Sequence, residues 1–172
     1  MKAKNIFITG KPGTGKTTLI KKIIAELNLN AGGFFTQEVR EAGERIGFDI
    51  LTLDGRRGTL ARKGMKSRFR VGKYGVSLND LDEIAVDSIR KALQENKIVI
   101  IDEIGKMELF SEKFKDAVVQ ALESENIVLG TIKLADDPFT DKIRRRDDTV
   151  IFELTAENRE EVGHLVKSAI GA

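Results

Sequence analysis

The feature that most constrains this chain is a glycine-rich run between an apolar segment and a helical pattern. Residues 10–17 read GKPGTGKT and fit the phosphate-binding loop pattern G-x-x-x-x-G-K-[ST]. A strand is predicted before the loop at 5–9. After it, apolar residues recur at helical spacing, and these are Leu19, Ile20, Ile23, Ile24 and Leu27. This order of strand, loop and helix predicts an α/β fold that binds a nucleotide at the loop.

The residue types of the loop suit phosphate chemistry. Glycines lack a Cβ, so the backbone can turn its N–H groups inward around phosphate oxygens, and the following helix directs its positive dipole end at the same place. Lys16 is expected to reach the β- and γ-phosphates and Thr17 to bind Mg²⁺. The predicted nucleotide-binding residues are Gly10, Lys11, Pro12, Gly13, Thr14, Gly15, Lys16, Thr17 and Thr18.

Composition excludes several classes of protein. A chain of 172 residues suits one domain, 1–172. The absence of cysteine excludes disulfides, thiolate zinc sites and cysteine nucleophiles, and a single histidine excludes a histidine-rich metal site. We expect a cytoplasmic protein, because no apolar run approaches the roughly 18 residues of a membrane span and no signal peptide pattern is present. Nothing in the sequence implies an oligomer, so a monomer is favoured.

Residues 33–76 are predicted to form a small antiparallel extension. Strand patterns occur at 34–40 and 46–50, with a third short strand around 59–61. No helical stretch separates them, so they do not form a βαβ unit. The interpretation is a hairpin with one added strand.

A basic tract lies within the same region. No acidic residue occurs between Gly55 and Asn79, although the chain as a whole balances 29 basic against 27 acidic residues. The tract could be a solvated loop, a triphosphate contact or a nucleic-acid contact. Nucleic acid is unlikely as a partner, because the tract offers only Phe69 and Tyr74 for stacking on bases. Its cations are Arg56, Arg57, Arg62, Lys63, Lys66, Arg68, Arg70 and Lys73.

A second candidate site element is the apolar run 98–101, which ends in Asp102 and Glu103. Such a run is typical of a strand buried on both faces, and parallel sheets bind ligands at the carboxyl edge. If this strand neighbours the first one, Asp102 lies beside Thr17 and can anchor the metal. Glu103 is expected on the opposite face, since strand side chains alternate, where it could take a proton from a water aligned on the γ-phosphate.

Five further residues are candidates for accessory roles, each with a plainer alternative. Lys106 could contact phosphate or be a solvated loop cation. Thr131 could form a hydrogen bond to the attacking water or the γ-phosphate, or its hydroxyl could simply be hydrogen-bonded within the protein at the end of its strand. Arg144, Arg145 and Arg146 could supply a charge-stabilising finger or complement the dipole of a short helix. The last helix is predicted to begin at Thr155.

With these residues located, the chain resembles the small cancer-related nucleoside triphosphatases over nearly its whole length. The similarity rests on GKPGTGKTT at 10–18, GFFTQEVREAGERIGFDILTLDGRRGTLA at 33–61, IIDEIGKMELFS at 100–111 and the tail IRRRDDTVIFELTAENR. It implies a P-loop three-layer α/β sandwich, with a mostly parallel sheet and an extra strand beside the phosphate-loop strand. It also implies Mg²⁺-dependent hydrolysis of several nucleoside triphosphates (ATP, GTP, CTP and UTP).

Carried over by position, the resemblance assigns phosphate binding to the loop with Lys16 and metal binding to Thr17 and Asp102. Base catalysis falls to Glu103. Rival interpretations are a nucleoside or nucleotide kinase and an RNA-modifying P-loop enzyme. A helical lid pattern, which kinases commonly use, is missing. A guanine-specific switch is disfavoured, because neither Asn-Lys-x-Asp nor Thr-Lys-x-Asp occurs.

Overall fold

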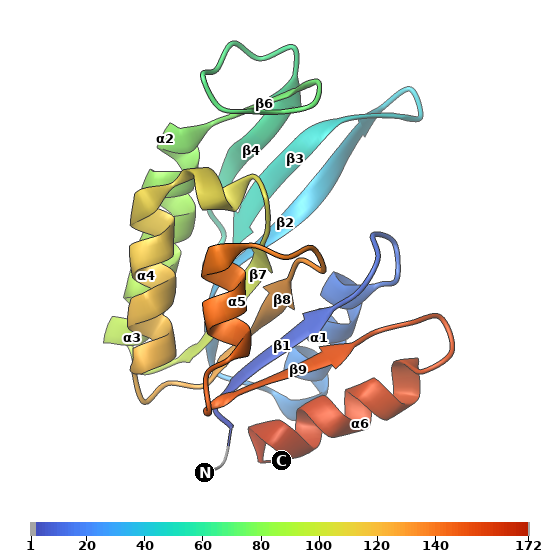
Figure 1. Ribbon diagram of the computed structural model, residues 1–172, viewed down its shortest axis with the longest axis vertical. Coiled ribbons are helices and arrows are strands. Elements are labelled where there is room, and N and C mark those ends of the chain that lie inside the picture. Colours follow the sequence, from blue (N-terminus) through green and yellow to red (C-terminus); the bar gives the residue numbers. More distant parts are fainter. Residues whose placement is uncertain (1–2, 172) are drawn as a thin grey trace.

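The computed structural model describes residues 3–171, which form a nine-stranded mixed sheet covered by helices (Figure 1). The strand order is β5-β6-β4-β3-β2-β7-β8-β1-β9. The strands are β1 (Asn5–Thr9), β2 (Ala31–Glu41), β3 (Glu44–Thr52), β4 (Arg57–Lys63), β5 (Arg70–Val71), β6 (Tyr74–Val76), β7 (Ile98–Ile104), β8 (Val128–Ile132) and β9 (Thr149–Glu153).

The helices connect these strands across both faces of the sheet. They are α1 (Lys16–Leu27), α2 (Leu78–Asp80), the π-helical turn η1 (Leu81–Ala85), α3 (Val86–Gln94), the 3₁₀ turn η2 (Glu108–Phe110), α4 (Glu112–Glu123), α5 (Pro138–Arg144) and α6 (Arg159–Ile170). The last helix begins at Arg159 and not at the predicted Thr155, because the Thr155 N–H is bonded to the side chain of Asn158 in a local turn. No helix in this part of the chain is long and apolar enough to cross a membrane.

Five strands, β2, β7, β8, β1 and β9, pair in parallel. The central residues of β1, β7 and β8 carry no exposed surface, as the apolar runs in β1 and β7 predict for strands covered on both faces, whereas β9 at the edge is only half-buried. β7, which carries Asp102, does not neighbour β1, however. β8 lies between them, so the premise of adjacency was wrong, whereas the inserted strand implied by the resemblance is confirmed.

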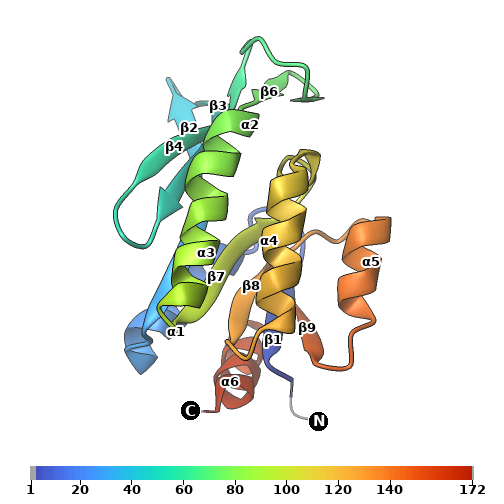
Figure 2. The ribbon, with the colours of Figure 1, turned by 90° about the vertical axis from the view of Figure 1, so that its left-hand side faces the viewer.

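Two separate apolar clusters show why the fold has three layers. One packs α3, α4 and Ile143 of α5 against one face of the sheet, with α3 and α4 side by side (Figure 2). The other packs α1 and α6 against the opposite face, through Ile20, Ile23 and Val166 among others. Alternate residues of β1 enter opposite clusters, Ile6 and Ile8 in one and Phe7 in the other. The predicted three-layer α/β class is confirmed.

The antiparallel extension continues the same sheet. β2 pairs with β7 only from Ala31 to Phe34, then runs on beyond it paired with β3, followed by β4, β6 and β5. We call residues 36–76 the wing. It projects past the carboxyl ends of the parallel strands (Figure 1). The wing is larger than the predicted hairpin because the polar alternation of Arg57–Lys63 and the very short β5 and β6 give weak strand signals in the sequence.

Candidate functional site

The glycine-rich loop leaves the buried strand β1 and enters α1 through a series of left-handed backbone positions. Gly10, Gly13 and Gly15 have φ angles of 151°, 82° and 89°. A Cβ on Gly10 would lie 2.6 Å from the Leu154 carbonyl oxygen, and one on Gly15 would lie 2.5 Å from Nη1 of Arg159. Gly10 therefore requires glycine for both conformation and space, and Gly13 and Gly15 require it for conformation. The loop is exposed at Lys11, Pro12 and Gly13 and at Thr18, the third residue of α1, and half-buried at Thr14.

Lys16 lies across the loop that it closes. Its Nζ donates to the Gly10 carbonyl at 2.8 Å and to the Lys11 carbonyl at 3.1 Å. The ammonium group is therefore held at the mouth of the loop by two weak neutral acceptors. A phosphate oxygen is a stronger, charged acceptor, so the side chain is positioned to exchange these carbonyls for phosphate.

Asp102 is the buried anion of the site, with only 3% of its surface exposed. Its two carboxylate oxygens accept from the hydroxyls of Thr17 and Thr131, each at 2.6 Å, and the backbone N–H of Thr36 also donates to it. Burial raises the pKa of Asp102, while these donors and the charge of Lys16 oppose the rise. The Thr17 hydroxyl and the carboxylate form a pair of hard oxygen ligands that suits a divalent cation such as Mg²⁺.

Glu103 lies at the same edge, half-buried, with no salt bridge to any residue of 3–171. Burial raises its pKa, and the charge of Asp102 raises it further, while Lys16 and Lys133 lower it. The peptide bond between Asp102 and Glu103 is cis. Pairing between β7 and β8 is irregular from Ile101 to Ile104, so the simple strand alternation on which the sequence argument relied does not apply here.

A third carboxyl group, Glu108 in η2, completes the acidic set and was missed by sequence reasoning. It is 3% exposed, and burial raises its pKa well above the ordinary value, with a further contribution from the charge of Glu103. The available signal was a glutamate placed among apolar neighbours, Met107-Glu108-Leu109-Phe110, directly after a strand that ends in two acids. An ordinary loop glutamate would be solvated.

Arg159 is the second residue that the sequence argument overlooked. It opens α6, and its Nη1 lies 3.4 Å from the Thr14 carbonyl oxygen and 3.3 Å from that of Gly15. A cation in the first turn of a helix opposes the helix dipole, and this was the sequence signal of a role outside the helix. The contact ties the start of α6 to the phosphate-binding loop.

The five residues considered for accessory roles lie in different parts of the fold. The Thr131 hydroxyl is committed to Asp102, and Lys106 is exposed on the segment that follows Glu103. Arg144 bonds to Thr140, Asp141 and the Lys133 carbonyl, whereas Arg145 is exposed and bonds to the Asp141 carbonyl. Arg146 pairs with Asp148 just before β9, at the edge of the sheet opposite the loop, so its position excludes it from the site.

Half of the cations of the basic tract form salt bridges within the wing and its neighbouring helix. The tract therefore presents less free positive charge than its composition suggests, which favours the plainer interpretation of a local structural role. The contacts are Arg56 with Asp54 and Asp87, Arg57 and Arg62 with Asp49, Lys63 with Glu44, and Arg70 with the carbonyls of Met65 and Lys73.

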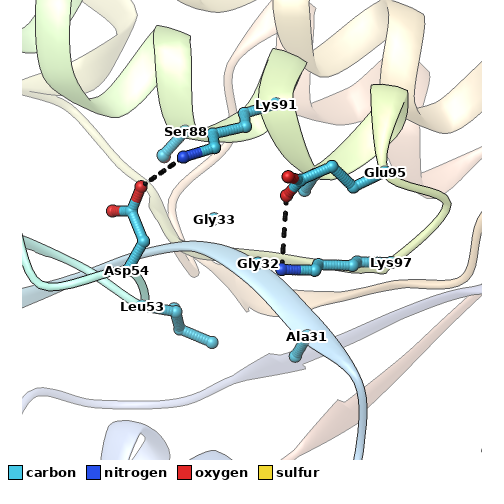
Figure 3. Close-up of a pocket in the computed structure, with 10 residues that line it drawn as sticks. Ala31, Gly32, Gly33, Leu53, Asp54, Ser88, Lys91, Glu95 and Lys97 are labelled. Carbon is cyan, nitrogen blue, oxygen red and sulfur yellow. Dashed lines mark hydrogen bonds and ion pairs between the residues drawn. The ribbon is translucent and has the colours of Figure 1, made fainter.

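A cavity of about 130 Å³ between β2 and α3 lies apart from this site (Figure 3). It adjoins the start of β2, at Ala31, and so lies toward the amino edge of the parallel strands. Its charged side chains are paired with one another, Lys91 with Asp54 at 3.1 Å and Lys97 with Glu95 at 3.2 Å. These pairs leave no uncompensated charge to recognise a phosphate.

Comparisons with known proteins agree on one family. A family model described as NTPase matches residues 5–166. The chain is 58% identical over 154 residues to nucleoside-triphosphatase THEP1 of Thermotoga sp. (strain RQ2), covering 90% of this chain and 88% of the relative. It is 42% identical over 173 residues to the human cancer-related nucleoside-triphosphatase, covering 91% of each.

Solved structures show the same likeness. The crystal structure of THEP1 from Aquifex aeolicus aligns with a TM-score of 0.88 at 42% identity, covering 98% of this chain and 99% of that one. The solution structure of a human cancer-related nucleoside triphosphatase aligns with a TM-score of 0.84 at 40% identity, covering 98% of each chain. The fold and the sequence are thus similar to these proteins over most of the chain.

Proposed function

We propose that this chain, which belongs to the NTPase family, hydrolyses nucleoside triphosphates to the nucleoside diphosphate and inorganic phosphate with Mg²⁺. ATP, GTP, CTP and UTP are the proposed substrates, because most of the binding energy would come from the phosphates and the metal and not from the base. The observation that carries this proposal is the meeting of Lys16, the Thr17–Asp102 pair and Glu103 at one edge of the sheet.

The triphosphate would be held by the loop and by Lys16. The backbone N–H groups of residues 10–17 and the start of α1 favour negative charge. Thr17 and Asp102 would hold Mg²⁺, which would supply charge neutralisation on the β- and γ-phosphates. Burial makes an isolated charge on Asp102 unfavourable, so a bound cation would also relieve the electrostatic cost of that carboxylate.

Glu103 would take a proton from the attacking water. Its carboxylate is close enough to Asp102 and Lys16 for both to alter its pKa, yet neither forms a hydrogen bond or salt bridge with it. The raised pKa makes it a stronger base than a solvated glutamate. Arg159 supports the loop from behind through the carbonyls of Thr14 and Gly15.

The proposal is tested by Lys16→Ala with each of the four triphosphates. Turnover should be lost and nucleotide affinity weakened without unfolding, because Lys16 is half-buried and contributes to the loop, not to the core. Parent efficiencies for the four should lie within about two orders of magnitude of each other. A folded variant with unchanged turnover, or strict use of one base, would contradict the proposal.

A further inference from the structure

A cavity of about 200 Å³ lies between the wing and the segment that follows β7. Its apolar lining comes from Phe48, Leu60 and Val71 of the wing and from Met107. Two carboxyl groups, Glu103 and Glu108, line it as well, together with Thr36 and the cation Lys106. The cavity is therefore mainly apolar, with hydrogen-bond acceptors concentrated beside the proposed catalytic glutamate.

Glu103 belongs to this cavity and to the phosphate site at once. It directly follows Asp102, whose carboxylate accepts a hydrogen bond from Thr17 of the phosphate site at 2.6 Å, and it is also part of the cavity lining. Thr36 joins the two compartments from the wing, because it lines the cavity and its N–H donates to Asp102. Whatever occupies the cavity can therefore present a group to Glu103 and to a phosphate held by the loop.

The cavity is larger and less polar than one attacking water requires. A water occupies about 30 Å³ in the liquid and needs two to four polar partners. A space of about 200 Å³ with aliphatic and aromatic walls instead matches a small ring compound, for which burial of apolar surface is favourable. The two carboxyl groups favour an occupant that donates a hydrogen bond, such as a hydroxyl group.

We propose that this cavity binds a small neutral alcohol with a flat apolar body, which replaces water as the acceptor of the γ-phosphoryl group. The inference rests on the proposed function, since Glu103 serves the same role in both reactions. The alcohol oxygen forms a bond to the γ-phosphorus, and its proton passes to Glu103. The bond from that phosphorus to the β–γ bridging oxygen breaks, and its electron pair leaves with the nucleoside diphosphate.

Benzyl alcohol is a suitable probe, because its ring fits the apolar walls and its hydroxyl can reach a carboxylate. The full chain is incubated with Mg·ATP and roughly 50 mM benzyl alcohol, and ADP, phosphate and benzyl phosphate are measured by ³¹P NMR and mass spectrometry. Transfer without a binding site would capture about 0.1% of the phosphoryl groups, the molar ratio of alcohol to water. We expect at least a tenfold excess over this ratio, and the excess should saturate as the concentration of benzyl alcohol rises.

Two variants connect transfer to the cavity. Val71→Phe fills it and should reduce the ratio of transfer to hydrolysis at least tenfold. Val39→Phe makes the same change at a half-buried wing position outside the lining and should keep the parent ratio. If ATP is hydrolysed but benzyl phosphate stays at the solvent ratio, or if both variants behave alike, the acceptor site is refuted and the hydrolase proposal stands. Loss of hydrolysis itself in the parent would refute both.

Discussion

Replacing Glu103 with glutamine isolates the proton-transfer step. The change keeps the size of the side chain and removes its charge and basicity. Removal of a general base typically costs about 10²–10⁴ in rate, which corresponds to about 2.7–5.5 kcal/mol in the activation barrier. Glu103 makes no salt bridge within residues 3–171, so the substitution breaks no ion pair of the fold. We therefore expect kcat to fall by that factor while the affinity for Mg·ATP is preserved.

The pH profile gives an independent check on the same prediction. Burial and Asp102 raise the pKa of Glu103, so its basic form is populated above that raised value and activity is lost as the pH falls through it. The acid limb of kcat should consequently lie above the ordinary glutamate pKa of about 4.3. In Glu103→Gln this limb should disappear, leaving a low and flat residual rate.

The assay is steady-state phosphate release combined with calorimetric titration of Mg·ATP, on variants whose circular dichroism matches the parent. Glu112→Gln is the matched control, because it makes the same change on an exposed residue of α4. Asp102→Asn should lose metal-dependent binding as well as rate. Parent turnover in folded Glu103→Gln, or equal losses in its affinity and its turnover, would refute the assignment of the base.

Three further substitutions test the supporting contacts. Arg159→Ala should raise KM for ATP about three- to tenfold with little change in kcat, since its two contacts to the loop are long and together worth about 1 kcal/mol. Lys167→Ala on the same helix is the control. An unchanged KM in Arg159→Ala would show that Arg159 does not support the loop. Thr131→Val should weaken Mg·ATP binding at least tenfold in titration, whereas Thr140→Val, another buried threonine, should not. Glu108→Gln should increase the free energy of unfolding by urea at pH 8 but not at pH 4. Ionisation of Glu108 costs stability only as the pH rises from the unfolded pKa toward its raised folded value. A gain that is independent of pH would contradict this account.

Local sequence was sufficient for the parts of the site that are local in space. The loop, its lysine and its threonine follow one another in the chain, and their strand and helix contexts fall within about twenty residues, so a motif specifies them. Asp102 and Glu103 could be placed at the correct edge because an apolar run marks a buried parallel strand. Their roles and those of the loop stay predictions until the variants are measured.

Contacts between distant segments could not be predicted in the same way. Arg159 reaches the loop from 144 residues away, and the burial of Glu108 depends on the packing of η2 against β7 and α4. Neither fact leaves a periodic pattern in the chain. The order of strands is also non-local, since the alternation of strands and helices is the same whether or not β8 lies between β1 and β7. The adjacency premise failed for that reason.

The inserted strand also explains why Thr131 is part of the site. Neighbouring strands lie about 4.8 Å apart, so β7 is displaced by about two strand spacings from β1, too far for adjacency alone to bring Asp102 to the loop. Thr17 narrows this gap because it is the second residue of α1, beyond the loop, and does not lie on β1 itself. Thr131, at the end of β8, lies in the intervening space and binds the second oxygen of the same carboxylate. The carboxylate is thus fixed from both sides, one oxygen toward the loop and one toward the inserted strand. Because β8 lies between β7 and β1, a hydroxyl at its carboxyl end is in a position to hold Asp102, and Thr131 supplies it.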